Sequence, residues 1–351
     1  MTSLSEVVDI VIGVDTHVDT HTAAIVAAGT GGAIDHLTIP TTPEGYQELL
    51  EWADEHGLLR AWAIEGTGGH GAGLTRVLAH AQEYVVELDR PERAQRRHGA
   101  KSDELDAVRA AREALSRPVL GTPRAAGDRQ ALSVLLAARR SAVDAHTVAQ
   151  RQLFSLTIAA PEVLRGKLRG HKPPHQVTIA ARLRILDSWD LETRTTAQVL
   201  RQLARRVRSL QTEADEHKKA ILAIVKRWRP DLLAQLGVGP IVAATVLCAW
   251  SHPGRIHSEA AFAMLAGVAP IPANSGQTTT RYRLNRYGDR QLNKALHTIV
   301  LTRQRLDEAT KAYTARRTAQ GKTPREIKRC LKRYIARDLY RLLEHPPLDN
   351  T

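Results

Sequence analysis

The chain has 351 residues, of which 43% are hydrophobic and 25% are charged, so we expect a folded protein with more than one domain. Its two cysteines, Cys248 and Cys330, exclude a disulfide scaffold and a cysteine-rich zinc site. Residues 1–6 lack the pattern of a signal peptide, and every apolar run is too short to cross a membrane. We therefore expect a cytoplasmic protein without a membrane partner.

The net charge of +13 is unevenly distributed along the chain. Residues 1–118 contain 19 acidic and 10 basic side chains, whereas residues 119–351 contain 18 acidic and 40 basic ones. A strongly basic second part predicts a polyanionic partner, and nucleic acid is the first candidate. An arginine-rich composition inherited from the genome would give the same excess of charge without any partner.

Residues 1–118 show an alternation of short apolar segments and amphipathic segments. Strands are predicted at 9–15, 21–28, 33–40, 60–67 and 84–89, and helices at 43–56, at 71–82 and from Ser102 onward. The three consecutive strands at the start are typical of a meander, and the later alternation is typical of parallel crossovers. The pattern predicts an α/β domain.

The second part of the chain is predominantly helical. Long helices are predicted at 129–156 and 195–228, with a loop at 169–176 between them. The second helix carries a four-heptad coiled-coil seam that consists of Leu200, Leu203, Val207, Leu210, Ala214, His217, Ile221, Ile224 and Trp228. The seam could pair with the first helix of the same chain or with another protomer.

Residues 231–351 combine an apolar helical hairpin with a basic segment. Gly237 and Gly239 interrupt the apolar stretch 232–250, as in helix-hairpin-helix motifs whose backbone N–H groups bind phosphate, although a plain helical hairpin has the same pattern. Residues 281–343 contain 18 basic and 5 acidic side chains. The predicted nucleic-acid contacts are Gly237, Gly239, Arg281, Arg283, Arg286, Arg290 and Lys294.

Four acidic side chains are candidates for a shared metal site. Asp15 ends the first predicted strand, Glu65 lies near the end of the fourth, and Asp103 and Asp106 lie in the first turn of the following helix. If the first and fourth strands are neighbours, these carboxylates meet at one sheet edge, where oxygen ligands would bind two Mg²⁺ or Mn²⁺ ions about 4 Å apart. Each acid alone could also be a turn cap, an ion-pair partner or a solvated first-turn residue.

Five sequence blocks resemble the transposases of the insertion-sequence-110 family. They are IGVDTH, AIEGTGG, KSDELDAVRAA, GVAPIPANSGQ and YGDRQLNKAL. The resemblance implies a ribonuclease-H-like (RuvC-like) catalytic domain at 1–118, a helical coiled-coil insert at 119–230 and a C-terminal transposase domain at 231–351. It also implies that Ser275 is a nucleophile toward DNA.

The same resemblance implies the partners and the reaction. Family members move an insertion sequence between donor and target double-stranded DNA, guided by a structured non-coding bridge RNA, and assemble as dimers and then tetramers. Such an enzyme would act in the bacterial cytoplasm, in association with the nucleoid when it is bound to DNA. Three residues depart from the frequent family pattern: His17 replaces Lys, Asp289 replaces Asn and Asn293 replaces Arg.

Two other functions remain open on the sequence. A metal-dependent Holliday-junction resolvase or nuclease of RuvC-like fold would use water as the nucleophile and would not need Ser275. A non-catalytic nucleic-acid scaffold would need neither Ser275 nor the metal. The joint presence of Asp15, Glu65, Asp103 and Asp106 argues against the scaffold.

Overall fold

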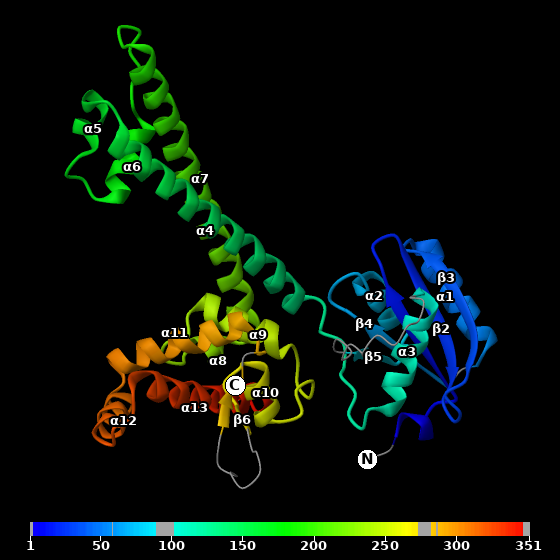
Figure 1. Ribbon diagram of the computed structural model, residues 1–351. Coiled ribbons are helices and arrows are strands. Elements are labelled where there is room, and N and C mark those ends of the chain that lie inside the picture. The colour runs from blue at the N-terminus through cyan, green and yellow to red at the C-terminus, as the bar shows by residue number, and fades with distance from the viewer. Residues whose placement is uncertain (1–2, 58, 89–101, 273–281, 286, 347–351) are drawn as a thin grey trace. The chain divides into compact units, whose positions relative to one another are not determined.

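The computed structural model describes residues 3–57, 59–88, 102–272, 282–285 and 287–346 (Figure 1). The chain forms two compact units, Met1–Ala126 and Gly127–Thr351, and each is described by itself below. The first unit is a mixed α/β domain and the second is almost entirely helical, which confirms the predicted classes. The finer division at residues 118 and 230 stays a prediction.

The first unit is built on a five-stranded sheet with the order β3-β2-β1-β4-β5. β1 pairs antiparallel with β2, which confirms the predicted meander, and parallel with β4, which meets the condition set for the shared metal site. The strands are β1 (Ile10–Thr16), β2 (Thr20–Ala27), β3 (Ala33–Pro40), β4 (Arg60–Glu65) and β5 (Val85–Leu88).

Helices cover both faces of this sheet, and its central strand β1 and the neighbouring β4 and β5 are buried on both sides, whereas β3 is largely exposed. Ile12 and Val14 face a core that includes Leu49 of α1 (Pro43–Glu55) and Leu74 of α2 (Ala72–His80). Val11 belongs to the core of the opposite face, which α3 (Asp103–Ser116) covers. Since side chains alternate along a strand, Asp15 emerges on the α3 face of β1.

Very close packing brings α3 onto β1. The helix buries only alanines, Ala107, Ala111 and Ala114, and it lies directly over Gly13. A Cβ atom at Gly13 would lie 2.0 Å from the carbonyl oxygen of Ala107 and 2.6 Å from the amide nitrogen of Ala111. Only glycine fits at this position, and the resulting approach sets the start of α3 beside the end of β1.

A buried ion pair ties β4 to the segment before β5. The Arg60 side chain is 5% exposed and donates to Glu83 at 2.5 and 3.0 Å and to Asp54 at 2.6 Å. Glu83 also accepts a hydrogen bond from the indole of Trp62 at 2.7 Å. Burial alone would raise the pKa of Glu83, but the hydrogen bonds from Arg60 and Trp62 outweigh it and lower that pKa below its ordinary value.

In the second unit, α4 (Asp128–Ala159) and α7 (Leu191–Trp228) lie side by side and run antiparallel (Figure 1). The predicted seam therefore has a partner in its own chain. Leu200, Val207 and Ile221 are buried as the heptad pattern requires, but Val225 is buried in place of Ile224. An α-helix has 3.6 residues per turn, so the buried stripe drifts from a strict seven-residue repeat.

The prediction of a loop at 169–176 is wrong in its second half. Short helices α5 (Glu162–Leu168) and α6 (Pro173–Ala181) lie near one end of the α4–α7 pair, and α6 begins at Pro173 (Figure 1). Proline is tolerated in the first helical turn because the N–H groups there have no acceptor within the helix. The Pro-Pro pair therefore starts a helix and does not prolong the loop.

The other ends of α4 and α7 belong to the core of the C-terminal helices. Leu132 of α4 and Ile221 of α7 pack in one cluster with Phe262, Leu296 and Leu339. The elements around this core are α8 (Pro230–Leu233), α9 (Pro240–Trp250), α10 (Glu259–Leu265), β6 (Pro270–Pro272), β7 (Tyr282–Leu284), α11 (Arg290–Leu306), α12 (Glu308–Ala319) and α13 (Pro324–Glu344). Among the described residues, no helix is long and apolar enough to cross a membrane.

Candidate functional site

Asp15 and Glu65 lie at the carboxyl ends of two adjacent parallel strands. The register pairs Val14 of β1 with Ile64 of β4, so the next residue of each strand lies at the same sheet edge. The hydroxyl of Thr16 donates to the carbonyl oxygen of Glu65 at 3.2 Å and ties the two strand ends together. This edge, the carboxyl end of parallel strands, is where ligands usually bind in α/β sheets.

The first turn of α3 contributes the other two acids. Ser102 caps the helix by accepting a hydrogen bond from the amide of Leu105 at 3.3 Å, as its sequence position predicts. Asp103 begins the helix, and its side chain is 49% exposed. Asp106, one turn later, forms an ion pair with Arg109 at 2.7 Å.

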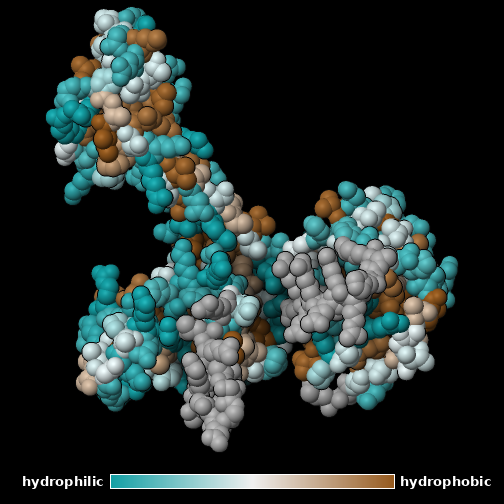
Figure 2. Space-filling model, in the orientation of Figure 1, coloured by the Kyte–Doolittle hydropathy of each residue, from teal (hydrophilic) through white to brown (hydrophobic). Residues whose placement is uncertain are grey.

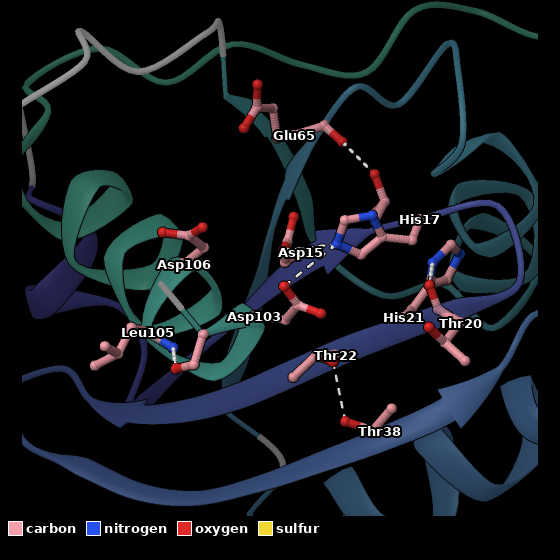
Figure 3. A network of polar contacts seen from close by, with 12 residues as sticks. Asp15, His17, Thr20, His21, Thr22, Thr38, Glu65, Asp103, Leu105 and Asp106 are labelled. Carbon is pink, nitrogen blue, oxygen red and sulfur yellow. Dashed lines mark hydrogen bonds and ion pairs between the residues drawn. The ribbon is translucent and has the colours of Figure 1, made fainter. Parts of the chain in front are cut away.

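His17 lies between Asp15 and Asp103 (Figure 3). Its Nε2 atom is 3.2 Å from Oδ2 of Asp15 and 3.6 Å from Oδ1 of Asp103. The ligand atoms of these three residues all lie within 4.8 Å of one another. Among the described residues, this is the group of acidic, histidine or cysteine side chains that could hold a metal ion.

The structure therefore brings together two of the four predicted metal ligands. Glu65 ends the neighbouring strand and Asp106 lies one helical turn after Asp103, but their carboxylates lie outside the group of three (Figure 3). His17 enters the group although the sequence marked it only as a departure from a family pattern. The usable signal was its spacing, because residues two apart on an extended strand share a face.

The donor atoms of this group suit a divalent cation. In octahedral coordination with bonds of about 2.1 Å, neighbouring ligand atoms are about 3.0 Å apart and opposite ones about 4.2 Å apart. The separations of 3.2 and 3.6 Å from His17 fall within that range. Carboxylate oxygens favour Mg²⁺ or Mn²⁺, and the two aspartates would hold either ion.

Part of the predicted C-terminal site lies outside the described residues. Ser275, Arg281 and Arg286 belong to this part. The backbone of Arg283 belongs to β7, where it pairs antiparallel with Ile271 of β6. The roles of these four residues stay predictions.

The predicted Gly-x-Gly turn joins α8 to α9. Gly237 has a φ of +89°, and a Cβ atom there would lie 3.2 Å from the Cα atom of Ile299 in α11. Gly239 is the N-cap of α9 and is followed by Pro240. Backbone conformation and close packing on α11 explain the glycine at 237, and a phosphate contact at this turn stays a prediction.

Arg290 and Lys294 are exposed on α11, and further cations lie on α13 beside that helix. Lys332 of α13 donates to the side-chain oxygen of Asn293 at 2.7 Å. We call the side chains of Arg290, Lys294, His297, Lys328 and Lys332 the basic face. Figure 2 shows a mostly hydrophilic surface over this group of helices. None of the ion pairs between described residues involves a member of the basic face.

The pKa values of two members reflect burial first and the nearby positive charges second. Burial lowers the pKa of Lys332, and nearby Arg329 lowers it further. Burial also lowers the pKa of His297, and the positive charges of Lys332 and Lys328 add to the effect. An approaching anion stabilises such a cluster, because it lowers the electrostatic repulsion between the positive charges.

Two of the departures from the family pattern have structural roles here. Asp289 caps α11 by accepting hydrogen bonds from the amides of Gln291 and Leu292 at 2.7 and 3.0 Å. Asn293 donates to the carbonyl oxygen of Ala266 at 2.8 Å while it accepts from Lys332. Both side chains stabilise the start of α11 and thereby position Arg290 and Lys294.

Comparison with known proteins gives two family models that match separate parts of the chain. Residues 12–157 match a DEDD-type transposase model of the IS110 group, and residues 231–315 match the transposase IS116/IS110/IS902 family. A curated relative, an uncharacterized 42 kDa protein of insertion element IS900 from Mycobacterium paratuberculosis, is 30% identical over 129 residues. That match covers 36% of this chain and only about a third (32%) of the relative.

Proposed function

The chain belongs to the IS110 family of transposases, and we propose that it cleaves and rejoins DNA strands as the recombinase of an insertion sequence. The observation that carries the proposal is the convergence of Asp15 and Asp103 at one sheet edge, within the part that matches the DEDD-type model. The sheet order and the position of α3 support a ribonuclease-H-like fold for this unit.

In this proposal the acidic residues of the first unit form the catalytic metal site. Asp15 and Asp103 would hold the divalent cation, and Glu65 and Asp106, at the same sheet edge, would be the further acidic residues of the site. The cation, Mg²⁺ or Mn²⁺, supplies charge stabilisation to the phosphate that reacts. The carboxylates fix that cation at the sheet edge, where the scissile phosphate can approach from solvent because Asp103 is half exposed.

We propose Ser275 as the nucleophile. Its Oγ atom attacks the scissile phosphorus and loses its proton, the P–O3′ bond breaks, and the departing strand takes up a proton as a free 3′-OH. The new phosphoserine bond retains the free energy of the phosphodiester, so rejoining to another 3′-OH needs no ATP. A bridge RNA that selects the DNA sites, and a dimer that assembles into a tetramer, are further parts of the proposal and rest on the family resemblance alone.

The basic face supports the nucleic-acid part of the proposal. Its cations have no acidic partner among the described residues, and phosphate groups of a nucleic-acid backbone would neutralise them. Binding of this kind releases counterions and therefore weakens steeply as the salt concentration rises.

Strand cleavage of supercoiled DNA that carries the element ends tests the catalytic assignment. Asp15→Asn should abolish cleavage and leave DNA binding intact. Glu104→Gln is the matched control, because Glu104 lies in the same helical turn but its carboxylate contacts His36 at 3.3 Å. Equal losses of binding and cleavage in Asp15→Asn would refute the assignment.

Ser275→Ala distinguishes the proposal from its main alternative, a metal-dependent junction resolvase or nuclease. A hydrolytic enzyme uses water and would keep its cleavage activity in this variant. A recombinase that forms a serine–DNA bond would lose cleavage and would no longer yield a covalent protein–DNA adduct after denaturation. Full cleavage by Ser275→Ala would favour the nuclease.

A further inference from the structure

We call the sheet edge that carries Asp15, His17 and Asp103 the acidic edge. His17 is the member of this edge that has no role in the proposed mechanism. It follows β1 directly, and its backbone amide donates to the carbonyl oxygen of Thr20 at 3.1 Å, which holds the tight turn into β2. The turn fixes where the imidazole lies, and the 43% exposure of this side chain leaves access for an ion from solvent. The backbone from which the imidazole extends is thus fixed by the turn, and Nε2 lies 3.2 Å from Oδ2 of Asp15.

Because Nε2 faces one carboxylate oxygen from β1 and one from α3, a cation bound by both aspartates has the imidazole nitrogen within coordination distance. The separations of 3.2 and 3.6 Å are closer to the spacing of neighbouring ligands in an octahedral shell, about 3.0 Å, than to that of opposite ligands. The alternative is a histidine that only hydrogen-bonds the two carboxylates and holds them in place. The two alternatives differ in whether nitrogen touches the metal.

We infer that Nε2 of His17 is a ligand of the divalent cation at Asp15 and Asp103, and that the site therefore favours Mn²⁺ over Mg²⁺. The inference rests on the proposed function, because it needs those aspartates to bind the cation. Mg²⁺ strongly prefers oxygen ligands, whereas Mn²⁺ accepts an imidazole nitrogen more readily. A lysine at this position, which is frequent in the family, would offer a positive charge in place of a ligand.

Pulsed electron paramagnetic resonance of Mn²⁺ bound to the full-length chain tests the ligand directly. We expect electron spin echo modulation from a coordinated ¹⁴N nucleus in the wild-type protein, and its replacement by a ¹⁵N signal when histidine is ¹⁵N-labelled. The modulation should disappear in His17→Gln and persist in His36→Gln, a control histidine that also lies beside a carboxylate of the same unit. Bound Mn²⁺ without nitrogen modulation in the wild-type protein would overturn the inference.

Affinities provide a second readout. Titration of Mn²⁺, followed by the signal of the free ion, should show about a tenfold loss of Mn²⁺ affinity in His17→Gln. The Mg²⁺ affinity, measured by competition with Mn²⁺, should fall by less than about threefold. Equal losses for both ions would contradict the ligand role.

Asp15→Asn separates this inference from the proposed function. If Asp15→Asn abolishes Mn²⁺ binding while the wild-type protein shows no nitrogen modulation, the metal site stands and the role of His17 fails. If Asp15→Asn binds Mn²⁺ as the wild-type protein does, the proposed metal site fails and the inference fails with it.

Discussion

The acidic edge of the first unit and the basic face of the second unit both gather like charges, but the chain holds them in different ways. At the acidic edge, Asp15 and Asp103 come from distant segments and meet because α3 packs on Gly13 without any intervening side chain. On the basic face, the cations follow the exposed sides of α11 and α13. The first arrangement depends on one close contact, whereas the second depends on helical periodicity and on the contact between Lys332 and Asn293.

This difference predicts how each region responds to substitution. A site formed by a few converging atoms loses its function when one atom is changed, because binding of the cation depends on all of them. A surface of several separate cations loses affinity in small increments, because each phosphate contact contributes by itself. The following predictions run from the largest expected effect to the smallest.

The largest effect is expected for Asp103→Asn at the acidic edge. Loss of one carboxylate from the cation site should lower the rate of strand cleavage by about a thousandfold, which corresponds to about 4 kcal/mol of transition-state stabilisation. The thermal unfolding midpoint should stay the same or rise, because two like charges no longer face each other. Single-turnover cleavage and calorimetry measure the two quantities, and a lower midpoint would point to a structural role for Asp103.

The next largest effect is a loss of stability at Arg60. Its buried charge is paired with Asp54 and Glu83, whereas the carboxylates of the acidic edge face each other. Arg60→Met leaves Glu83 buried without its cation and should lower the free energy of unfolding by about 3 kcal/mol near pH 7. Denaturation by urea gives this value. A change below about 0.5 kcal/mol would show that the pair adds little to stability.

The same pair predicts a pH dependence. The folded-state pKa of Glu83 is lowered below its ordinary value of 4.5, so its contribution is complete above that pH and is lost as the pH falls through the folded-state pKa. The difference in unfolding free energy between wild type and Arg60→Met should therefore narrow below about pH 4.5. A difference that stays constant down to pH 3 would contradict this assignment.

A smaller loss of stability is expected at the contact between α3 and β1. Gly13→Ala places a Cβ atom against the backbone of Ala107 and should cost about 1–3 kcal/mol of unfolding free energy. Because α3 must move away from β1, Mn²⁺ affinity should fall although every proposed ligand is still present. Gly29→Ala is the control, since a Cβ atom there meets nothing within 4 Å. Unchanged Mn²⁺ affinity in Gly13→Ala would show that the close contact between α3 and β1 does not position the metal ligands.

The smallest effects are expected on the basic face. Lys294→Gln and Lys332→Gln should each weaken DNA binding a few-fold and reduce the slope of log affinity against log salt by about one. Lys322→Gln, at an exposed position before α13, is a control for net charge. If all three variants gave the same slope, overall charge and not the basic face would attract the nucleic acid.

Local sequence patterns determined much of this protein. Short apolar segments specified the five strands, and Ser102 marked the start of α3 as its N-cap. Heptad spacing specified the long helix that pairs with α4. These features depend on neighbours within a few residues along the chain, so they can be read from the chain itself.

Only the tertiary structure decided which of these residues meet. It paired the seam with a helix of the same chain, and it joined Asp15 and Asp103 while leaving Glu65 and Asp106 outside the group of three. It also placed His17, which the sequence marked only as a departure from a family pattern, beside Asp15 and Asp103. Such contacts depend on the approach of segments far apart in the sequence, and that approach depends on backbone packing at Gly13, which no local pattern specifies.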